Sequence, residues 1–261
     1  EPEFVEFAIK YTFDIKDVIT NNNWYKLIPL SYVYGTVPTY ILTFFTIIFV
    51  QISQVVGFTF EKIDIYVLNR SINLFVGILM VPAIYFLVLK MFKNKLSAGL
   101  SAILVLLNWK LIVHSHYVNA DLFLSSFVLI SFLFLFLYFN FTQDSLQKST
   151  NKFTKNFSEQ SMFLILSAIF VGLSVGTKVT SLLTIFLYWL VILSKKDFRG
   201  FFAFNFIIFG TFAVTNPFSI LFIQDFVYRV YSMSTKEAGM VFDSVDYGVF
   251  KYFWALIDMV T

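Results

Sequence analysis

The segment His114-Ser-His116-Tyr-Val-Asn-Ala-Asp121 brings two imidazoles and a carboxylate together within eight residues, and it holds both histidines of the chain. Long apolar runs, 96–113 and 122–139, precede and follow it. Ionisable side chains at the end of a membrane span are costly to hold there, so their presence indicates function. Such a group could transfer protons, bind a divalent cation or hydrate a turn between two helices.

Each of these side chains has a structural alternative. Asp121 is placed to begin the helix after the turn, where an N-cap carboxylate accepts hydrogen bonds from free backbone N–H groups. The same carboxylate could serve as a catalytic acid or base, and one group can do both. His114, His116 and Asp121 together are a candidate site for a divalent cation, whereas interfacial polarity would also account for the histidines.

Three basic residues could hold an anionic group near this turn. Lys178 ends an apolar run directly after Thr177, where it could extend its amine into the head-group region. Alternatively, Lys178 and the Thr177 hydroxyl could bind a phosphate. Arg70 precedes the first long apolar run and Arg229 follows the last, so both are further candidates for binding the same anion.

Composition predicts an integral membrane protein. Of the 261 residues, 58% are hydrophobic and 13% are charged, and the mean hydropathy is +0.78. A soluble domain is roughly half apolar and about a quarter charged. The sequence contains no Cys, which excludes disulfides, a thiolate nucleophile and Cys-ligated metals.

A membrane-spanning helix needs about 20 predominantly apolar residues. Six segments approach that length: 72–89, 96–113, 122–139, 162–176, 181–193 and 201–214. Lys and Arg cluster in three connections, 90–95, 148–155 and 195–199, which the positive-inside rule assigns to the cytoplasmic face. Because two spans separate each cluster from the next, the turns 114–121 and 177–181 are expected on the opposite, outer face.

The same topology assigns three regions. Residues 1–70 form a first outer loop, 71–215 the six-span bundle, and 216–261 an outer loop that leads into a truncated further span. The apolar run 40–50 is only about 11 residues long, which is typical of an interfacial or re-entrant segment. The spacing over 4–11 predicts an amphipathic helix on the membrane surface. We therefore expect an all-α polytopic bundle with surface helices in its large outer loop.

In this order and on these sides of the membrane, the motifs resemble the GT-C superfamily of glycosyltransferases. The closest similarity is to prokaryotic relatives of dolichyl-phosphate-mannose protein mannosyltransferases and aminoarabinose transferases. The resemblance extends from the opening Glu1-Pro-Glu-Phe to about residue 217. It rests on Arg70 before a Ser/Asn/Gly-containing span, Asp121 after the His-containing turn, and Gly-x-x-x-Gly-Thr-Lys178.

The resemblance implies transfer of a sugar from a polyprenyl-phosphate carrier to a lipid, protein or glycan acceptor. In such enzymes the first outer loop begins with an Asp-Glu pair; Glu1 matches its Glu, so the Asp would lie directly before residue 1. Glu1 and Asp121 are the implied catalytic acids. Lys178 matches a lysine near the carrier phosphate, and Arg70, His116, Thr177 and Arg229 complete the candidate substrate site.

These features predict a membrane glycosyltransferase of the plasma (inner) membrane that is active on the non-cytoplasmic face. The sequence is expected to be part of a longer protein, lacking both ends. A divalent cation is a candidate cofactor, membrane lipid surrounds the protein, and nucleic acid is not an expected partner. The alternative is a transporter or flippase for a lipid-linked or anionic substrate, in which ionisable groups would line a path through the spans.

Overall fold

The chain folds into helices throughout the part that the structure describes. The computed structural model describes residues 2–28, 35–147 and 153–232, and these contain no strand. The expected all-α bundle is confirmed. The elements are α1 (Pro2–Asn21), η1 (Trp24–Leu27), α2 (Val37–Val56), α3 (Lys62–Ile78), α4 (Met80–Phe92), α5 (Lys95–Leu106), α6 (Trp109–Ser115), α7 (Ala120–Gln147), α8 (Phe153–Thr177), η2 (Val179–Ser181), α9 (Leu182–Ser194), α10 (Phe198–Thr215), α11 (Pro217–Leu221) and α12 (Ile223–Ser232).

Short polar side chains mark where several of these helices begin. Asn94 accepts hydrogen bonds from the first free N–H groups of α5, Asn108 does the same for α6, and Asp197 accepts from Gly200 N in α10. The first four N–H groups of a helix have no partner within the helix. These caps satisfy some of them and fix the helix starts at the edges of the apolar runs.

The predicted spans correspond to helices, although not all of them are long. Segments 62–92, 120–140 and 198–215 are long and apolar enough to cross a membrane. The predicted span 96–113 is a broken pair, α5 and α6, bent by 51°. The predicted spans 162–176 and 181–193 lie within shorter apolar helices. The number of crossings therefore stays a prediction.

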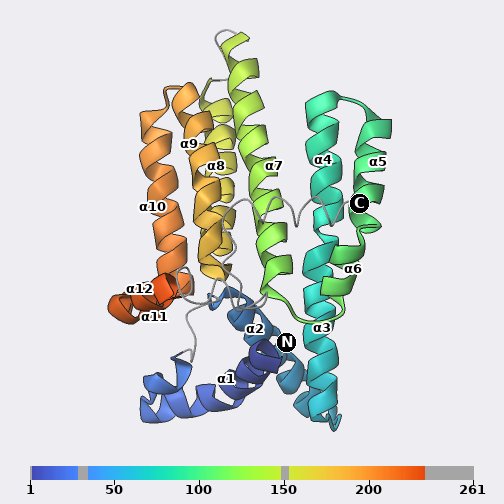
Figure 1. Ribbon diagram of the computed structural model, residues 1–261, viewed down its shortest axis with the longest axis vertical. Helices are drawn as coiled ribbons and strands as arrows, with labels where there is room; N and C mark the ends of the chain where they lie inside the picture. Colours follow the sequence, from blue (N-terminus) through green and yellow to red (C-terminus); the bar gives the residue numbers. More distant parts are fainter. Residues whose placement is uncertain (1, 29–34, 148–152, 233–261) are drawn as a thin grey trace, which may run out of the picture.

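Helix α2 is longer than the sequence suggested. The apolar run 40–50 lies within a 20-residue helix that is itself long and apolar enough to span a membrane. The helix is longer than the apolar run because it begins at Val37, with Pro38 in its first turn, and continues through Gln51 and Gln54. Figure 1 shows α2 running obliquely at the lower end of the upright helices, close to α1, which lies across that end.

Two groups of buried apolar side chains hold these parts together. One fills the space among α7, α8, α9 and α10 and includes Tyr138, Tyr188 and Phe204. The other joins α1, α2 and α3 to the beginning of α7, through Val5, Leu42, Val76 and Phe123 among others. The second group therefore packs the N-terminal helices against the end of α7 that carries Asp121.

The basic turns and the His-containing turn lie at opposite ends of the bundle. The α4–α5 turn, with Lys93, and the α9–α10 turn, with Lys195 and Lys196, are at the upper end in Figure 1. The segment between α6 and α7, which leads to Asp121, is at the lower end. This arrangement agrees with the separation of charge that was used to assign the two faces.

Candidate active site

The structure brings Asp121 and Lys178 into contact. The Lys178 ammonium lies 2.8 Å from Asp121 Oδ1, across 57 residues of sequence. Asp121 is in the first turn of α7, and Lys178 is the single residue between α8 and η2. The side chains are 46% and 29% exposed, respectively. A pair this exposed stabilises a fold by only about 0.2–1 kcal/mol, so stability alone is a poor reason for placing it here.

Asn119, rather than Asp121, caps α7. The Asn119 side-chain oxygen accepts a hydrogen bond from Asp121 N at 2.9 Å, and the helix begins at Ala120. The capping alternative for Asp121 was therefore wrong by two residues. The carboxylate still benefits from the positive end of the helix dipole in this first turn. Because it is not needed as the cap, it is free to pair with Lys178.

Asn73 holds the turn from the side. This fully buried residue of α3 donates from Nδ2 to His114 O at 3.1 Å and to Tyr117 O at 2.9 Å, while its Oδ1 accepts from Asn119 N at 3.4 Å. One amide thus binds three backbone groups of the segment that connects α6 to α7. Sequence reasoning missed it, although an Asn within an apolar helix is itself a signal of a polar contact.

The two histidines are engaged within the turn. His114 Nδ1 contacts the Tyr117 hydroxyl and the Asn119 side-chain amide, both of which can donate to it. His116 Nδ1 is 2.7 Å from Ile112 O, to which it can donate. Across the described part of the chain, no three His, Cys, Asp or Glu side chains are grouped to hold a metal ion. The metal site predicted from His114, His116 and Asp121 is therefore not formed.

Lys178 is held in place by the segment that precedes α2. Gly35 N donates to Thr177 O at 2.9 Å, and Thr36 N donates to the Asn216 side chain at 2.9 Å. The Thr36 hydroxyl also bonds to Thr215 O. A Cβ on Gly35 would lie 1.7 Å from Gly176 O. Only glycine therefore lets this segment reach the end of α8, directly beside Lys178.

The remaining predicted residues do not share one arrangement. Thr177 is fully buried and its hydroxyl donates to Leu173 O, so it supports Lys178 rather than presenting a hydroxyl at the surface. His116 is exposed on the turn. Arg70 is exposed on α3, and Arg229 is exposed on α12, a helix that begins beyond α10. Glu1 lies outside the described residues.

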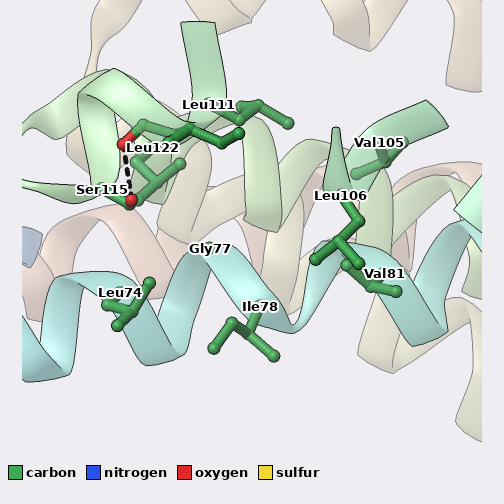
Figure 2. Close-up of a pocket in the computed structure, with 10 residues that line it drawn as sticks. Leu74, Gly77, Ile78, Val81, Val105, Leu106, Leu111, Ser115 and Leu122 are labelled. Atoms are coloured by element: carbon green, nitrogen blue, oxygen red, sulfur yellow. Dashed lines mark hydrogen bonds between the residues drawn. The ribbon is translucent and has the colours of Figure 1, made fainter. Parts of the chain in front are cut away.

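Close packing of α3 against α7 brings the turn near the bundle. Figure 2 shows Gly77 of α3 facing Leu122, the residue after Asp121, beside Ser115 of α6. A Cβ on Gly77 would lie 2.9 Å from Leu122 Cδ2, and the Ser126 hydroxyl donates to Val76 O. These contacts border a small apolar groove, and they fix the start of α7 against α3.

In chemical terms, the site offers a carboxylate and an ammonium at one end of a helix bundle. A carboxylate can accept a proton from a hydroxyl, and an ammonium can stabilise negative charge on a departing group. Both are partly exposed, and both are held by buried polar contacts on opposite sides. Asn73 and Asn119 hold the backbone that carries the Asp121 carboxylate. Gly35, Thr36 and Asn216 hold the backbone next to Lys178.

Comparison with known families gives the chemistry a context. The family of dolichyl-phosphate-mannose-protein mannosyltransferases matches residues 50–215, more than half of the chain, and this range includes both Asp121 and Lys178. Comparisons with curated proteins and with solved structures gave no match. The match favours glycosyl transfer over the transporter alternative. The chain belongs to the dolichyl-phosphate-mannose-protein mannosyltransferase family, whose members are membrane glycosyltransferases that use a polyprenyl-phosphate-linked sugar.

Proposed function

We propose that this protein transfers a sugar from a polyprenyl-phosphate carrier to an acceptor hydroxyl on the non-cytoplasmic face of the membrane. The observation that carries the proposal is the contact between Asp121 and Lys178, at the end of the bundle opposite the basic turns. The positive-inside rule assigns those basic turns to the cytoplasm. Asp121 and Lys178 are then outside.

Lys178 binds the carrier phosphate in this proposal. When the glycosidic bond breaks, its electron pair stays on the phosphate oxygen, which becomes more negative. A cation placed beside that oxygen stabilises the transition state more than the ground state. The exposed pair is weak enough to open. An arriving phosphate therefore competes with Asp121 for the ammonium and releases the carboxylate.

Asp121 accepts the proton of the acceptor hydroxyl. The acceptor oxygen forms the new bond to the sugar carbon as the bond to the carrier phosphate breaks, so atoms and charge balance without any other reactant. General-base assistance of this kind contributes about 10²–10⁴-fold. The roles differ: Lys178 governs use of the donor, and Asp121 governs turnover. Glu1 and Arg70 stay candidates for assisting them.

Transfer from a radiolabelled polyprenyl-phosphate sugar, measured in membranes with matched expression, tests these roles. Lys178→Ala removes a charge-assisted contact worth about 1.5–3 kcal/mol, which corresponds to roughly a ten- to hundred-fold loss that appears mainly as a higher KM for the donor. Lys178→Arg should lose less. Asp121→Asn should lower kcat, because it keeps the shape of the side chain and removes the base.

A second ion pair supplies the control. Lys26 and Asp14 lie 3.8 Å apart, with side chains 31% and 26% exposed, in the N-terminal helices. Lys26→Ala and Asp14→Asn remove charges of similar exposure, and transfer should be unchanged. Near-normal kcat in Asp121→Asn, or equal losses in the two pairs, would show that the Asp121–Lys178 contact is not the catalytic centre.

A further inference from the structure

We propose that Asn73 is a positioning residue that holds Asp121 in the geometry required for turnover, acting through Asn119. The inference rests on the proposed function, because it assigns Asp121 the role of the base. It concerns a side chain on α3 that is separate from Lys178 and bonds the backbone of the turn. Hydrogen bonds connect α3 to the backbone that carries the carboxylate.

Asn73 binds the turn through two backbone carbonyls. The carbonyl of His114 is among the last of α6, and such carbonyls have no partner within their helix. Asn73 supplies one for His114 and another for Tyr117, with N–O distances of 3.1 and 2.9 Å. With both groups bound to one buried amide, the backbone between the two helices has a fixed position relative to α3.

Asn119 connects Asn73 to Asp121 through two hydrogen bonds. Its N–H points to Asn73 Oδ1 at 3.4 Å, and its side-chain oxygen accepts from Asp121 N at 2.9 Å. The other end of that side chain contacts His114 Nδ1, which fixes the orientation of the amide. Asp121 is therefore two hydrogen bonds away from Asn73. A displacement of the turn moves the backbone that carries the carboxylate.

A buried Asn is costly unless both ends of its amide are bonded. Asn69 shows what such a residue does when it is only structural. It lies one turn earlier on the same helix and is also fully buried, but it donates within α3 to Ile65 O and accepts from the Thr46 hydroxyl of α2. Asn69 does not contact the turn, which makes it a matched control for Asn73.

Transfer kinetics separate a positioning role from a purely structural one. Asn73→Ala should lower kcat about ten- to a hundred-fold, the cost of a misplacement of about 1 Å. KM for the donor should change little, because Lys178 is held by Gly35 and Thr36. Asn69→Ala should leave both parameters unchanged once the amount of folded protein is matched. Combined with Asp121→Asn, Asn73→Ala should lower kcat no further, since it acts through the same group.

A variant of unchanged volume covers the case in which Asn73→Ala does not fold. Asn73→Asp places a carboxyl against the two carbonyls, and only its protonated form can donate to one of them. Its kcat, relative to that of the unmutated protein, should rise as the pH is lowered. A pH profile parallel to that of the unmutated protein would contradict the proposed contact.

Cross-linking tests the geometry without any activity. Because the sequence contains no Cys, the pair Asp121→Cys and Lys178→Cys can be joined by a short bifunctional methanethiosulfonate with no background. Adding Asn73→Ala should reduce the yield, whereas adding Asn69→Ala should not. A reduced yield, together with no transfer by the protein in which Asp121 and Lys178 are intact, would support the positioning role and overturn the proposed function. Equal yields and equal kcat for the two Asn variants would overturn the positioning role itself.

Discussion

Gly35→Ala should destabilise the protein more than any other glycine-to-alanine change in the described part of the chain. The new Cβ would lie 1.7 Å from the backbone oxygen of Gly176 and 2.9 Å from the Asn216 side chain. A backbone atom cannot rotate away, so the segment before α2 must move by more than 1 Å. Overpacking of this kind costs about 1–3 kcal/mol, and loss of the Gly35 N to Thr177 O bond adds about 0.5–1.5 kcal/mol.

The two effects together predict a loss of roughly 1.5–4.5 kcal/mol, which corresponds to a fall in Tm of about 3–18 °C at about 2–4 °C per kcal/mol. Thermal unfolding of the detergent-solubilised protein measures it. Gly99→Ala is the control: no atom lies within 4 Å of its new Cβ, and the change should be neutral or slightly stabilising in helix α5. If Gly35→Ala matched Gly99→Ala in Tm, the contact between the two segments would not exist in the folded protein.

Three further outcomes follow from the same contacts. Asn216→Ala leaves the buried Thr36 N–H without its acceptor and should lower the free energy of unfolding by about 1–3 kcal/mol. Asn216→Asp can still accept this hydrogen bond and should lower it less. Unfolding measurements compare the two variants, and equal losses of stability would contradict the contact. Cysteines introduced at positions 36 and 58, at the two ends of α2, should be labelled from the same side of the membrane, and labelling from opposite sides would make α2 a span. Asp197→Ala removes the cap of α10 and the acceptor of the Tyr138 hydroxyl. It should lower Tm, with about 0.5–2 kcal/mol of stability lost for the cap, and leave kcat unchanged. A large fall in kcat would contradict a purely structural role for Asp197.

The contact between Asp121 and Lys178 was within reach of sequence reasoning. The apolar runs and the basic connections placed both residues at outer ends of spans, and consecutive antiparallel helices bring such ends together. Neither inference needed side-chain detail. The all-α fold followed in the same way, because apolar segments in a membrane must satisfy their backbone groups internally.

The supporting contacts were not within reach. Thr36 and Asn216 are 180 residues apart, and nothing local in either segment specifies the other. The choice between Asn119 and Asp121 as the cap of α7 was also open, because both side chains can accept from backbone N–H groups and they lie two positions apart. In the structure Asn119 Oδ1 accepts from Asp121 N, and the Asp121 carboxylate pairs with Lys178 instead.

The beginning of α3 shows a different limit. Residues 62–70 include Lys62, Asp64 and Arg70 and were assigned to the outer loop, yet the helix starts at Lys62. The Asp64 side chain accepts from Glu61 N, and Ile65 and Asn69 are buried on one face of the helix. Tertiary packing against α1 and α2 thus extends the helix beyond the apolar run, as it commonly overrides local preference. That extension places Asn69 against Thr46 of α2, one turn before Asn73, which bonds the turn at the start of α7.

The two halves of the site are held by different parts of the chain. Asp121 depends on α3 through Asn73 and Asn119, whereas Lys178 depends on the segment before α2 and on the end of α10. Changes around Asn73 should therefore affect turnover, and changes around Gly35 should affect use of the donor. In the proposed reaction, the weak, partly exposed ion pair joins the halves only until a phosphate replaces the carboxylate at Lys178. A site assembled in this way keeps its acid and its cation separately positioned after their contact has opened, so that Lys178 can hold the donor phosphate while Asp121 acts on the acceptor hydroxyl, as proposed.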